Sequence, residues 1–324
     1  MPLNDILSSV FNEACVTTNE EQQILGPFTY VSALPGKGIR HDLLHALNVW
    51  MNVPEDKLKI IANLVAALHN ASLMLDDIED NSKLRRGSPA THRIFGIPQT
   101  INAATYVHCA TYQELYGLEG TGIEHRELSK LLTEELKSLH YGQGLDLLWR
   151  DSMQCPTEDE YIEMVKGKTG GLLRIGVRLM MARPTNDSNI SFRRDYVPLI
   201  NLVGVHFQIR DDFINLRSKM YSASKGFAED MEEGKFSFPI IHAIHVDGPS
   251  RQMINVLQQR PTTPTLKTYA INHMEQKTDS FEYTLSILEG LECEIRKQIF
   301  QLGGNAALTK IIDALHIGRE NQDL

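Results

Sequence analysis

The sequence predicts an all-α protein in which two helices can face each other across a cavity. Apolar residues recur at helical spacing along most of the 324 residues, and no convincing series of alternating strand patterns appears. Two of the most apolar segments end in paired acids, so their polar ends can meet at one rim above an apolar interior. No linker indicates a second unit, and we expect residues 1–324 to form a single domain.

The composition is ordinary for a globular protein in water, with 42% hydrophobic and 23% charged residues. A net charge of −9 argues against nucleic acid or an anionic membrane surface as the main partner, because both require a basic face. No apolar stretch reaches the roughly 18 residues of a transmembrane segment, and residues 1–14 do not resemble a signal peptide. Scattered cysteines suit a reducing compartment, and we expect a cytoplasmic protein; they are Cys15, Cys109, Cys155 and Cys293.

The helical segments are separated by loops that contain glycine, proline and polar residues. Helices are expected over residues 4–14, 19–30, 40–50, 55 into the first acid block, 99–116, 126–149 and 202–216, and again from 240 onward. Thr157 and Glu160 form a capping box for a further helix. Loops are expected at 183–191 and at 222–239, and the second carries Lys225 and Lys235 and is a candidate lid.

The most informative segment is the apolar helix that ends in a block of acids. Asp76 and Asp80 lie four residues apart, so a helix projects both carboxylates from one face, with Asp77 to one side. Acid clusters are most often solvated surface, but this helix is almost uncharged and expected to be buried, where unpaired carboxylates are costly. Oxygen ligands without His or Cys favour Mg²⁺, and Arg85 and Arg86 follow in position to bind substrate phosphates.

Two basic features lie upstream of these acids. Lys37 stands between glycines that let the backbone approach a ligand closely, and Arg40 adds a second cation; a solvated turn is the alternative. His69 lies seven residues before Asp76, two turns away on the same helix face. A histidine packed in the core is the alternative for that position.

The remaining candidate residues lie further along the chain. Gly142 and Gly144 interrupt a helical pattern, which costs stability unless another backbone or a ligand packs there. Lys168 belongs to a second basic segment that contains three glycines. Asp211 and Asn215 repeat the four-residue offset of the first acids, which predicts two polar helix ends facing one cavity.

Five motifs between residues 34 and 242 resemble, in the same order, those of the trans-isoprenyl diphosphate synthases. They are Gly36-Lys37, DDIED with a trailing Arg-Arg-Gly, Lys168-Thr169-Gly-Gly, the segment from Gln208 to Asn215, and Gly234-Lys-Phe-Ser-Phe-Pro. The chain looks closest to the fungal geranylgeranyl diphosphate synthases, including the prenyltransferase domains of fungal bifunctional terpene synthases. The resemblance implies an isoprenoid-synthase-type helical bundle around a deep central cavity, usually a homodimer, either free-standing or joined to a terpene cyclase domain.

The resemblance also implies a reaction. An allylic diphosphate (dimethylallyl, geranyl or farnesyl) ionises, the double bond of isopentenyl diphosphate attacks the cation, and loss of a proton gives a chain five carbons longer. The product would feed terpenoid biosynthesis. Such a reaction needs electrophilic stabilisation of the departing phosphate, which metal ions and fixed cations supply.

Motif by motif, the resemblance assigns residues to three groups. Mg²⁺, three ions per site, would be held by Asp76, Asp80 and Asp211. The allylic diphosphate would be contacted by Arg85, Lys168, Lys225 and Lys235 with Asn215 beside it, while Thr169 and Gln208 place oxygens near the developing cation. Isopentenyl diphosphate would be held by Lys37, Arg40, His69 and Arg86. Asn215 stands where many relatives have Asp, which leaves one ligand of the second motif neutral.

Chain length in such a protein is set by the floor of the cavity. Ala71 and Ser72 are small and would not block a growing chain. His108, Cys109 and His140 align with deeper positions, and the first two of these carry bulkier aromatics in some C20-forming relatives. The expected product is therefore geranylgeranyl diphosphate (C20) or a longer one such as geranylfarnesyl diphosphate (C25).

Two other functions compete with this one. A class I terpene cyclase shares the DDxxD motif, but its second metal motif needs a Ser or Thr and a Glu at successive four-residue offsets, which the stretch from Asp212 lacks. Lys37 and Arg40 would also have no purpose in a cyclase. A non-catalytic partner subunit of a synthase is the other alternative, against which the intact acids of both motifs argue. A purely structural helical protein does not explain why the motifs occur together.

Overall fold

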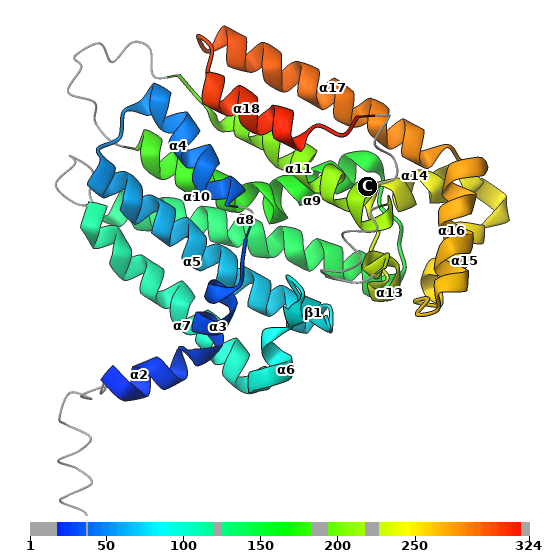
Figure 1. The fold of residues 1–324 in the computed structure, drawn as a ribbon, viewed down its shortest axis with the longest axis horizontal. Helices are drawn as coiled ribbons and strands as arrows, with labels where there is room; N and C mark the ends of the chain where they lie inside the picture. The colour runs from blue at the N-terminus through cyan, green and yellow to red at the C-terminus, as the bar shows by residue number, and fades with distance from the viewer. Residues whose placement is uncertain (1–17, 37, 119–124, 183–193, 218–226, 319–324) are drawn as a thin grey trace, which may run out of the picture.

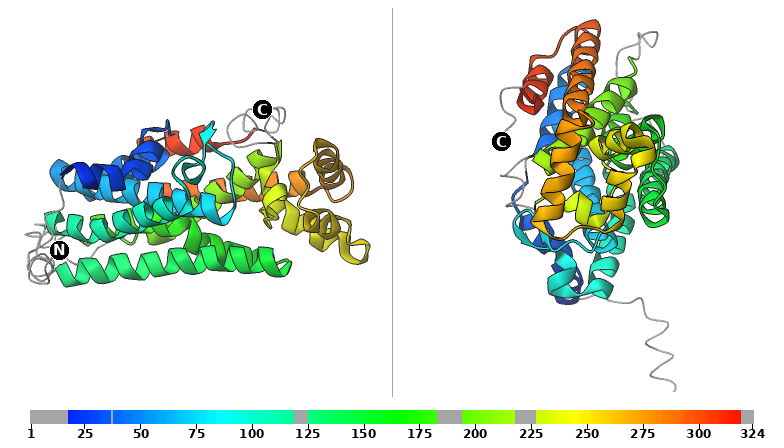
Figure 2. Two further views of the ribbon diagram at one scale, coloured as in Figure 1. Left: turned by 90° about the horizontal axis from the view of Figure 1, so that it is seen from below. Right: turned by 90° about the vertical axis from the view of Figure 1, so that its right-hand side faces the viewer.

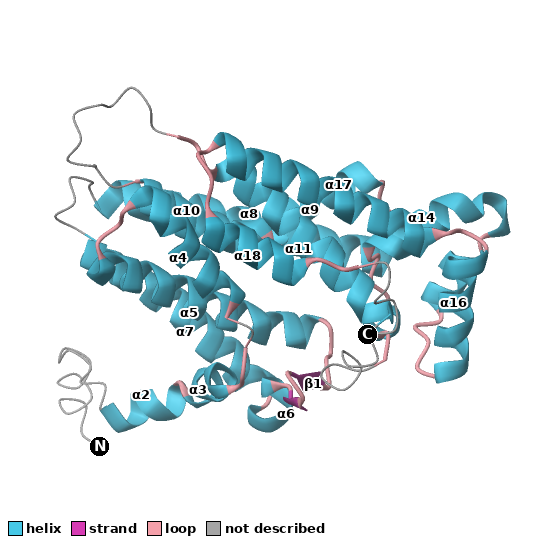
Figure 3. Cartoon of the chain, turned by 45° about the horizontal axis from the view of Figure 1, so that its top comes forward, coloured by secondary structure: helices cyan, strands magenta, loops and turns pink. Residues whose placement is uncertain are grey.

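The computed structural model describes residues 18–36, 38–118, 125–182, 194–217 and 227–318. The predicted all-α fold is confirmed: the described residues form sixteen α-helices, two short 3-10 turns and one hairpin of two-residue strands (Figures 1 and 3). The expected helix over residues 4–14 lies outside the described residues.

The first half of the chain contains α2 (Thr18–Ile24), α3 (Gly26–Ala33), α4 (Ile39–Met51), α5 (Glu55–Glu79), β1 (Leu84–Arg85), β2 (Ser88–Pro89), α6 (Thr91–Phe95), α7 (Ile97–Glu114) and the 3-10 turn η1 (Leu115–Leu118). The second half contains α8 (His125–Ser152), α9 (Glu158–Lys168), α10 (Gly170–Met181), α11 (Val197–Arg217), α13 (Glu229–Glu233), α14 (Phe238–Asp247), η3 (Gly248–Ser250), α15 (Gln252–Gln258), α16 (Pro264–Gln276), α17 (Ser280–Gln301) and α18 (Ala306–Leu315).

The long helices run side by side, and α14 to α16 gather at one end of the bundle (Figures 1 and 2). Helix α10 lies at the centre of the bundle and contacts α5, α8 and α11. Two apolar clusters form the main core, and α11 belongs to both: Val203 packs in the first, Ile209 and Phe213 in the second. Because α11 packs against both clusters, its apolar residues lie on more than one side of the helix and do not form a single stripe.

Helix α5 is long and apolar enough to cross a membrane by length and composition alone. Leu58, Ile61, Leu64, Val65 and Leu68 recur at helical spacing and are buried in the first core cluster. The helix packs against α7 and α10. Core helices of water-exposed proteins pass the same test, so this helix is weak evidence for a membrane span.

Some elements differ from those expected. The segment 19–30 forms two helices, because the chain turns at Leu25 and Pro27 lies in the first turn of α3. A backbone N–H at that position would have no partner within the helix, so proline costs no hydrogen bond there. The expected loop 222–239 contains α13 in its described part. The capping box at Thr157 is confirmed: its side chain accepts from the backbone N–H of Glu160, whose carboxylate accepts from the N–H of Thr157.

Helices α8 and α9 cross in close contact. A Cβ atom on Gly142 would lie 2.5 Å from the backbone nitrogen of Lys168, and one on Gly167 would lie 2.8 Å from the carbonyl oxygen of Ser138. The close backbone of α9 therefore explains a glycine at position 142. No such neighbour explains Gly144, where an added Cβ atom would meet nothing within 4 Å. The crossing brings the end of α9 to the acids of α8.

Candidate active site

One cavity of about 800 Å³ opens between helices α4, α5, α8, α9 and α11. Asp76 of α5 and Asp211 of α11 both line it, so the two acidic motifs contribute to one site as their sequences predicted. Apolar side chains of α4, α5, α8 and α10 line its deeper part: Leu44, Val65, Leu73, Leu139 and Leu172. The cavity therefore combines a polar rim with an apolar interior.

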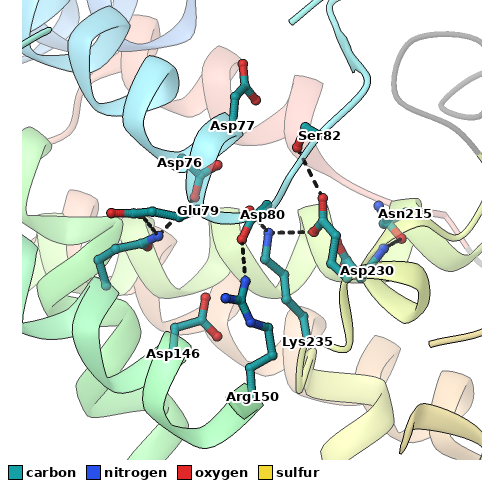
Figure 4. A network of polar contacts seen from close by, with 12 residues as sticks. Asp76, Asp77, Glu79, Asp80, Ser82, Asp146, Arg150, Asn215, Asp230 and Lys235 are labelled. Atoms are coloured by element: carbon teal, nitrogen blue, oxygen red, sulfur yellow. Dashed lines mark hydrogen bonds and ion pairs between the residues drawn. The ribbon is translucent and has the colours of Figure 1, made fainter. Parts of the chain in front are cut away.

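Asp76 lies within a network that joins α5 to α8 (Figure 4). The amide nitrogen of Gln143 donates to Asp76 at 3.3 Å and to Glu79 at 2.6 Å. Burial raises the pKa of Glu79, although the Gln143 hydrogen bond opposes this. Lys168 donates to Asp146 at 2.6 Å and lies 3.7 Å from Asp76. The network fixes the first acid of the motif beside a lysine.

Asp80 points away from the cavity, unlike Asp76. It caps the C-terminus of α5, and its side chain is only 1% exposed. Arg150 donates to one oxygen of Asp80 at 2.9 Å, and Lys235 forms an ion pair with the other (Figure 4). Burial raises the pKa of Asp80 to about 7, although Lys235 lowers it. The expectation that both acids project side by side into the cavity thus holds only for Asp76, because two cations hold Asp80 elsewhere.

Arg85 is held by the second acid of the motif. Its Nε donates to Asp77 at 2.8 Å, and its NH2 group donates to Asp76 at 3.3 Å. Asp77 is fully buried. Both Arg85 and Arg86 line the cavity because the hairpin turns at Arg86 and Gly87, which take the left-handed conformations of a tight two-residue turn.

A separate basic group lines the cavity beside α4. An NH1 group of Arg40 lies 3.1 Å from Nε2 of His69, and since a guanidinium only donates, that ring nitrogen accepts. Burial, followed by Arg40 and Arg86, lowers the pKa of His69 well below its ordinary value, so the ring is neutral. Burial also lowers the pKa of Arg40 to about 10. Lys37 lies outside the described residues, while Gly36 lies against the Arg86 guanidinium.

Thr169 and Gln208 meet across α9 and α11. The Thr169 hydroxyl donates to the Gln208 oxygen at 2.6 Å, and the Gln208 amide donates to Asp212 at 2.8 Å. Asp212 also accepts from the Tyr161 hydroxyl at 2.6 Å and the Phe238 N–H at 2.8 Å. Burial raises the pKa of Asp212 to about 6. The chain of bonds fixes which end of the Gln208 amide faces Thr169.

The other residues of the second motif lie in different surroundings. Asn215 is buried, and its oxygen accepts from the backbone N–H of Asp230 at 3.4 Å rather than lining the cavity (Figure 4). Lys235 lines the cavity and also pairs with Glu233 at 2.7 Å. Lys225 lies outside the described residues.

The five residues expected to set chain length are not all at the cavity wall. Ser72 and His140 line it, and the His108 ring lies 5.7 Å from that of His140. Ala71 is one position further round α5, fully buried against α7 in a third core cluster. Cys109 is exposed on α7. Of the five, Ala71, His108 and Cys109 are not part of the wall.

The sequence reasoning missed several polar residues of this site. Gln143, Asp146 and Arg150 recur at spacings of three and four on α8 and are all buried. That spacing places them on one helix face. These residues could have been predicted from the sequence, because they form a polar stripe among otherwise apolar positions of a buried helix.

The acids fit Mg²⁺ by their chemistry but do not form a ready-made metal centre. Within the described ranges, no three acidic, His or Cys side chains come together closely enough to hold a metal ion. The carboxylates that line the cavity offer hard oxygen ligands, and they are Asp76, Glu79, Asp146, Asp211, Asp212 and Asp230. This donor set suits an ion that is bound partly by a phosphate substrate.

The chain is similar in sequence to proteins of known activity over most of its length. The family model described as polyprenyl synthetase matches residues 21–274. A geranylgeranyl pyrophosphate synthase from Hericium erinaceus is 48% identical over 318 residues, which cover 92% of this chain and 93% of that protein. One from Mucor circinelloides f. lusitanicus is 48% identical over 301 residues, covering 93% and 95%. The chain therefore belongs to the polyprenyl synthetase family of prenyl-transferring enzymes.

Proposed function

We propose that this chain joins an allylic diphosphate to isopentenyl diphosphate in a Mg²⁺-dependent reaction whose main product is geranylgeranyl diphosphate. The observation that carries the proposal is the cavity of about 800 Å³, which is lined both by residues of the two acidic motifs and by the two basic groups and has apolar side chains in its interior. The names of the relatives from Hericium erinaceus and Mucor circinelloides support the C20 product.

The two basic groups suit two different diphosphates. The group of Arg40, His69 and Arg86, together with Lys37, would bind isopentenyl diphosphate, and the neutral His69 adds a ring N–H donor at Nδ1. The allylic diphosphate would lie at the acidic rim. There it would contact Arg85, Lys168, Lys225 and Lys235, with Asn215 behind them.

Asp76, Asp80 and Asp211 would hold the metal ions, three per site by the family resemblance. When bound, Mg²⁺ neutralises diphosphate oxygens and stabilises the charge that develops as the leaving group departs. Lys168 and Arg85 are already fixed by Asp146 and Asp77, so they would meet that charge without reorganising.

The residues below the rim would guide the carbon chemistry. As the allylic C–O bond breaks, the oxygens of Thr169 and Gln208 would face the carbocation, with their orientation set by the bond between them. The double bond of isopentenyl diphosphate then forms the new C–C bond, and a proton is lost. The apolar walls exclude the water that would otherwise quench the cation.

The cavity is long enough for an extended prenyl chain. It is lined along α5 from Asp76 down to Ala62, and fourteen residues of helix rise about 21 Å. Ser72 lies one turn below Asp76 and is too small to block this path. C25 products stay within the proposed range for the same reason.

A homodimer would cover apolar side chains that one chain leaves exposed. Ile97, Ile101 and Tyr106 of α7, and Tyr141 and Leu148 of α8, are between 38% and 70% exposed. The two helices are neighbours, since the Tyr112 hydroxyl lies 2.9 Å from that of Thr133. An apolar surface shared by adjacent helices is typical of subunit interfaces.

The proposal is tested by incubating the isolated chain with farnesyl diphosphate, isopentenyl diphosphate and Mg²⁺, then measuring the masses of the dephosphorylated alcohols. We expect geranylgeraniol as the main alcohol, with any C25 alcohol seen in the same spectrum. Hydrocarbons formed without isopentenyl diphosphate would indicate a cyclase instead. No turnover by the isolated chain would indicate a non-catalytic partner subunit.

A further inference from the structure

Arg150 is a buried cation near the acidic rim that the proposed chemistry does not use. It lies in the last turn of α8, its side chain is 10% exposed, and its NH1 group donates to Asp80 at 2.9 Å. Its Nε donates to Asp151 at 3.1 Å, a residue whose side chain is 64% exposed. Arg150 thus joins the exposed Asp151 to Asp80, a buried acid of the DDIED motif, and Figure 4 shows the pair with Asp80.

Both carboxylate oxygens of Asp80 are engaged. Arg150 holds Oδ1, and Lys235 holds Oδ2 while also pairing with Glu233. A buried carboxylate with two cationic partners is well compensated, and removing one partner is costly. A divalent cation approaching Asp80 alone would have to displace Lys235 and would lie close to the positive charge of Arg150.

A bound diphosphate changes this balance. Its negative charge attracts Lys235, which lines the cavity and can turn toward a phosphate on its flexible stem. Such a move would leave Oδ2 of Asp80 available to help hold a metal ion, and the phosphate charge would offset the repulsion from the nearby cations. Arg150 does not line the cavity, so its bond to Oδ1 would be left in place.

We propose that Arg150 is a positioning residue that prevents Asp80 from binding a divalent cation until a diphosphate is present, so that metal and diphosphate enter together. The inference rests on the proposed function, in which Asp80 is a metal ligand. Arg150 acts through Asp80 and touches no substrate.

The test measures binding of Mn²⁺, as a probe for Mg²⁺, by electron paramagnetic resonance, with and without inorganic pyrophosphate. Without pyrophosphate, Arg150→Gln should bind Mn²⁺ about tenfold more tightly than the wild type, because a fixed positive charge close to the ion is removed. Arg150→Lys keeps the charge and should stay near the wild type. Asp151→Asn is the matched control: it removes the other partner of Arg150, leaves the Asp80 pair intact and should not alter the Mn²⁺ affinity.

Adding Asp80→Asn to Arg150→Gln should abolish the gain, since the gain is assigned to Asp80. The inference is overturned if Arg150→Gln binds Mn²⁺ no more tightly than Asp151→Asn, or if the gain survives the loss of Asp80. If Arg150→Gln loses its helical circular dichroism and so does not fold, the single variant Asp80→Asn tests the inference instead. It must leave Mn²⁺ binding unchanged without pyrophosphate and weaken it with pyrophosphate; weaker binding in both conditions overturns the inference.

Failure of the proposed function gives a different result. In that case the wild type binds no Mn²⁺ even with pyrophosphate. If the wild type binds Mn²⁺ with pyrophosphate but Arg150→Gln gains nothing without it, the proposed function stands and the role of Arg150 does not.

Discussion

Lys168 and Asp146 form an ion pair of 2.6 Å between two different helices, α9 and α8. The pair forms because Gly142 and Gly167 leave almost no side-chain volume at the crossing. Burial disfavours the charged form of Lys168, but Asp146 and Asp76 outweigh it and raise the pKa of the lysine. The lysine therefore stays charged beside the acids.

This crossing predicts that Gly142→Ala is destabilising. The new methyl group would lie 2.5 Å from the Lys168 nitrogen and 2.7 Å from the Met164 oxygen, and backbone atoms cannot move aside easily. We expect urea titrations to show a loss of about 1–3 kcal/mol in the free energy of unfolding, together with lower turnover. Gly144→Ala is the matched control: it meets nothing within 4 Å and should be neutral or stabilising by up to about 1 kcal/mol. Equal stability of the two variants would refute the packing argument.

Ser72→Phe is predicted to shorten the product. The side chain lies at the cavity wall one turn below Asp76, so a benzyl group there would fill the path of the growing chain. With dimethylallyl and isopentenyl diphosphates as substrates, the alcohols released from the product should shift from C20 toward C15, as measured by mass spectrometry. The same substitution at the exposed Ser286 of α17 should leave the product spectrum unchanged. An unchanged spectrum for Ser72→Phe would exclude this part of the cavity as the chain path.

Cys109→Phe, which the sequence alone predicts to shorten the product, tests in the same assay whether α7 contributes to the floor of the cavity. Cys109 is exposed in one chain. A shorter product from this variant would indicate that the exposed face of α7 contributes to the cavity floor in an assembly. An unaltered spectrum would exclude the position from length control.

His69 predicts how stability changes with pH. Its pKa is well below 6.5 in the folded protein, whereas the unfolded chain titrates near that value. As the pH falls through about 6.5, the unfolded state therefore binds more protons at this histidine than the folded state does. The contribution of His69 to the free energy of unfolding is lost as the pH falls. His69→Gln keeps an acceptor for Arg40 but cannot titrate. Its free energy of unfolding should fall less than that of the wild type between about pH 7.5 and pH 5 in urea titrations. Parallel curves would contradict the assignment of a neutral His69.

Lys37→Ala should chiefly raise the KM for isopentenyl diphosphate, by about tenfold, because it removes one charge-assisted contact to a phosphate. Steady-state kinetics with each substrate varied in turn separate the two pockets. Lys59→Ala, an exposed lysine on α5, serves as the control. A selective effect on the allylic substrate would reverse the assignment of the two basic groups.

The features predicted correctly from the sequence are those set by local spacing. The apolar period of α5 and α11 places Asp76 and Asp211 at ends that meet in one cavity, and the Thr157 cap is a contact between neighbouring residues. The orientation of the Asp80 side chain toward Arg150 was not predictable. Its partner lies seventy residues away, and tertiary packing brings the two together. The position of the Asn215 side chain was not predictable either, because the hydrogen bond from the Asp230 N–H depends on how α13 packs against α11.

The central claim is that the acids at the rim bind the diphosphate through divalent cations, and the most direct measurement is the rate of condensation of farnesyl and isopentenyl diphosphates. With Mg²⁺, we expect turnover by the wild type and by Asp56→Ala, an exposed acid at the other end of α5. Asp76→Ala should lose turnover by about a hundredfold or more while its helical circular dichroism is unchanged, and chelation by EDTA should stop the wild type. Full activity of Asp76→Ala, or turnover that persists in EDTA, would contradict the account.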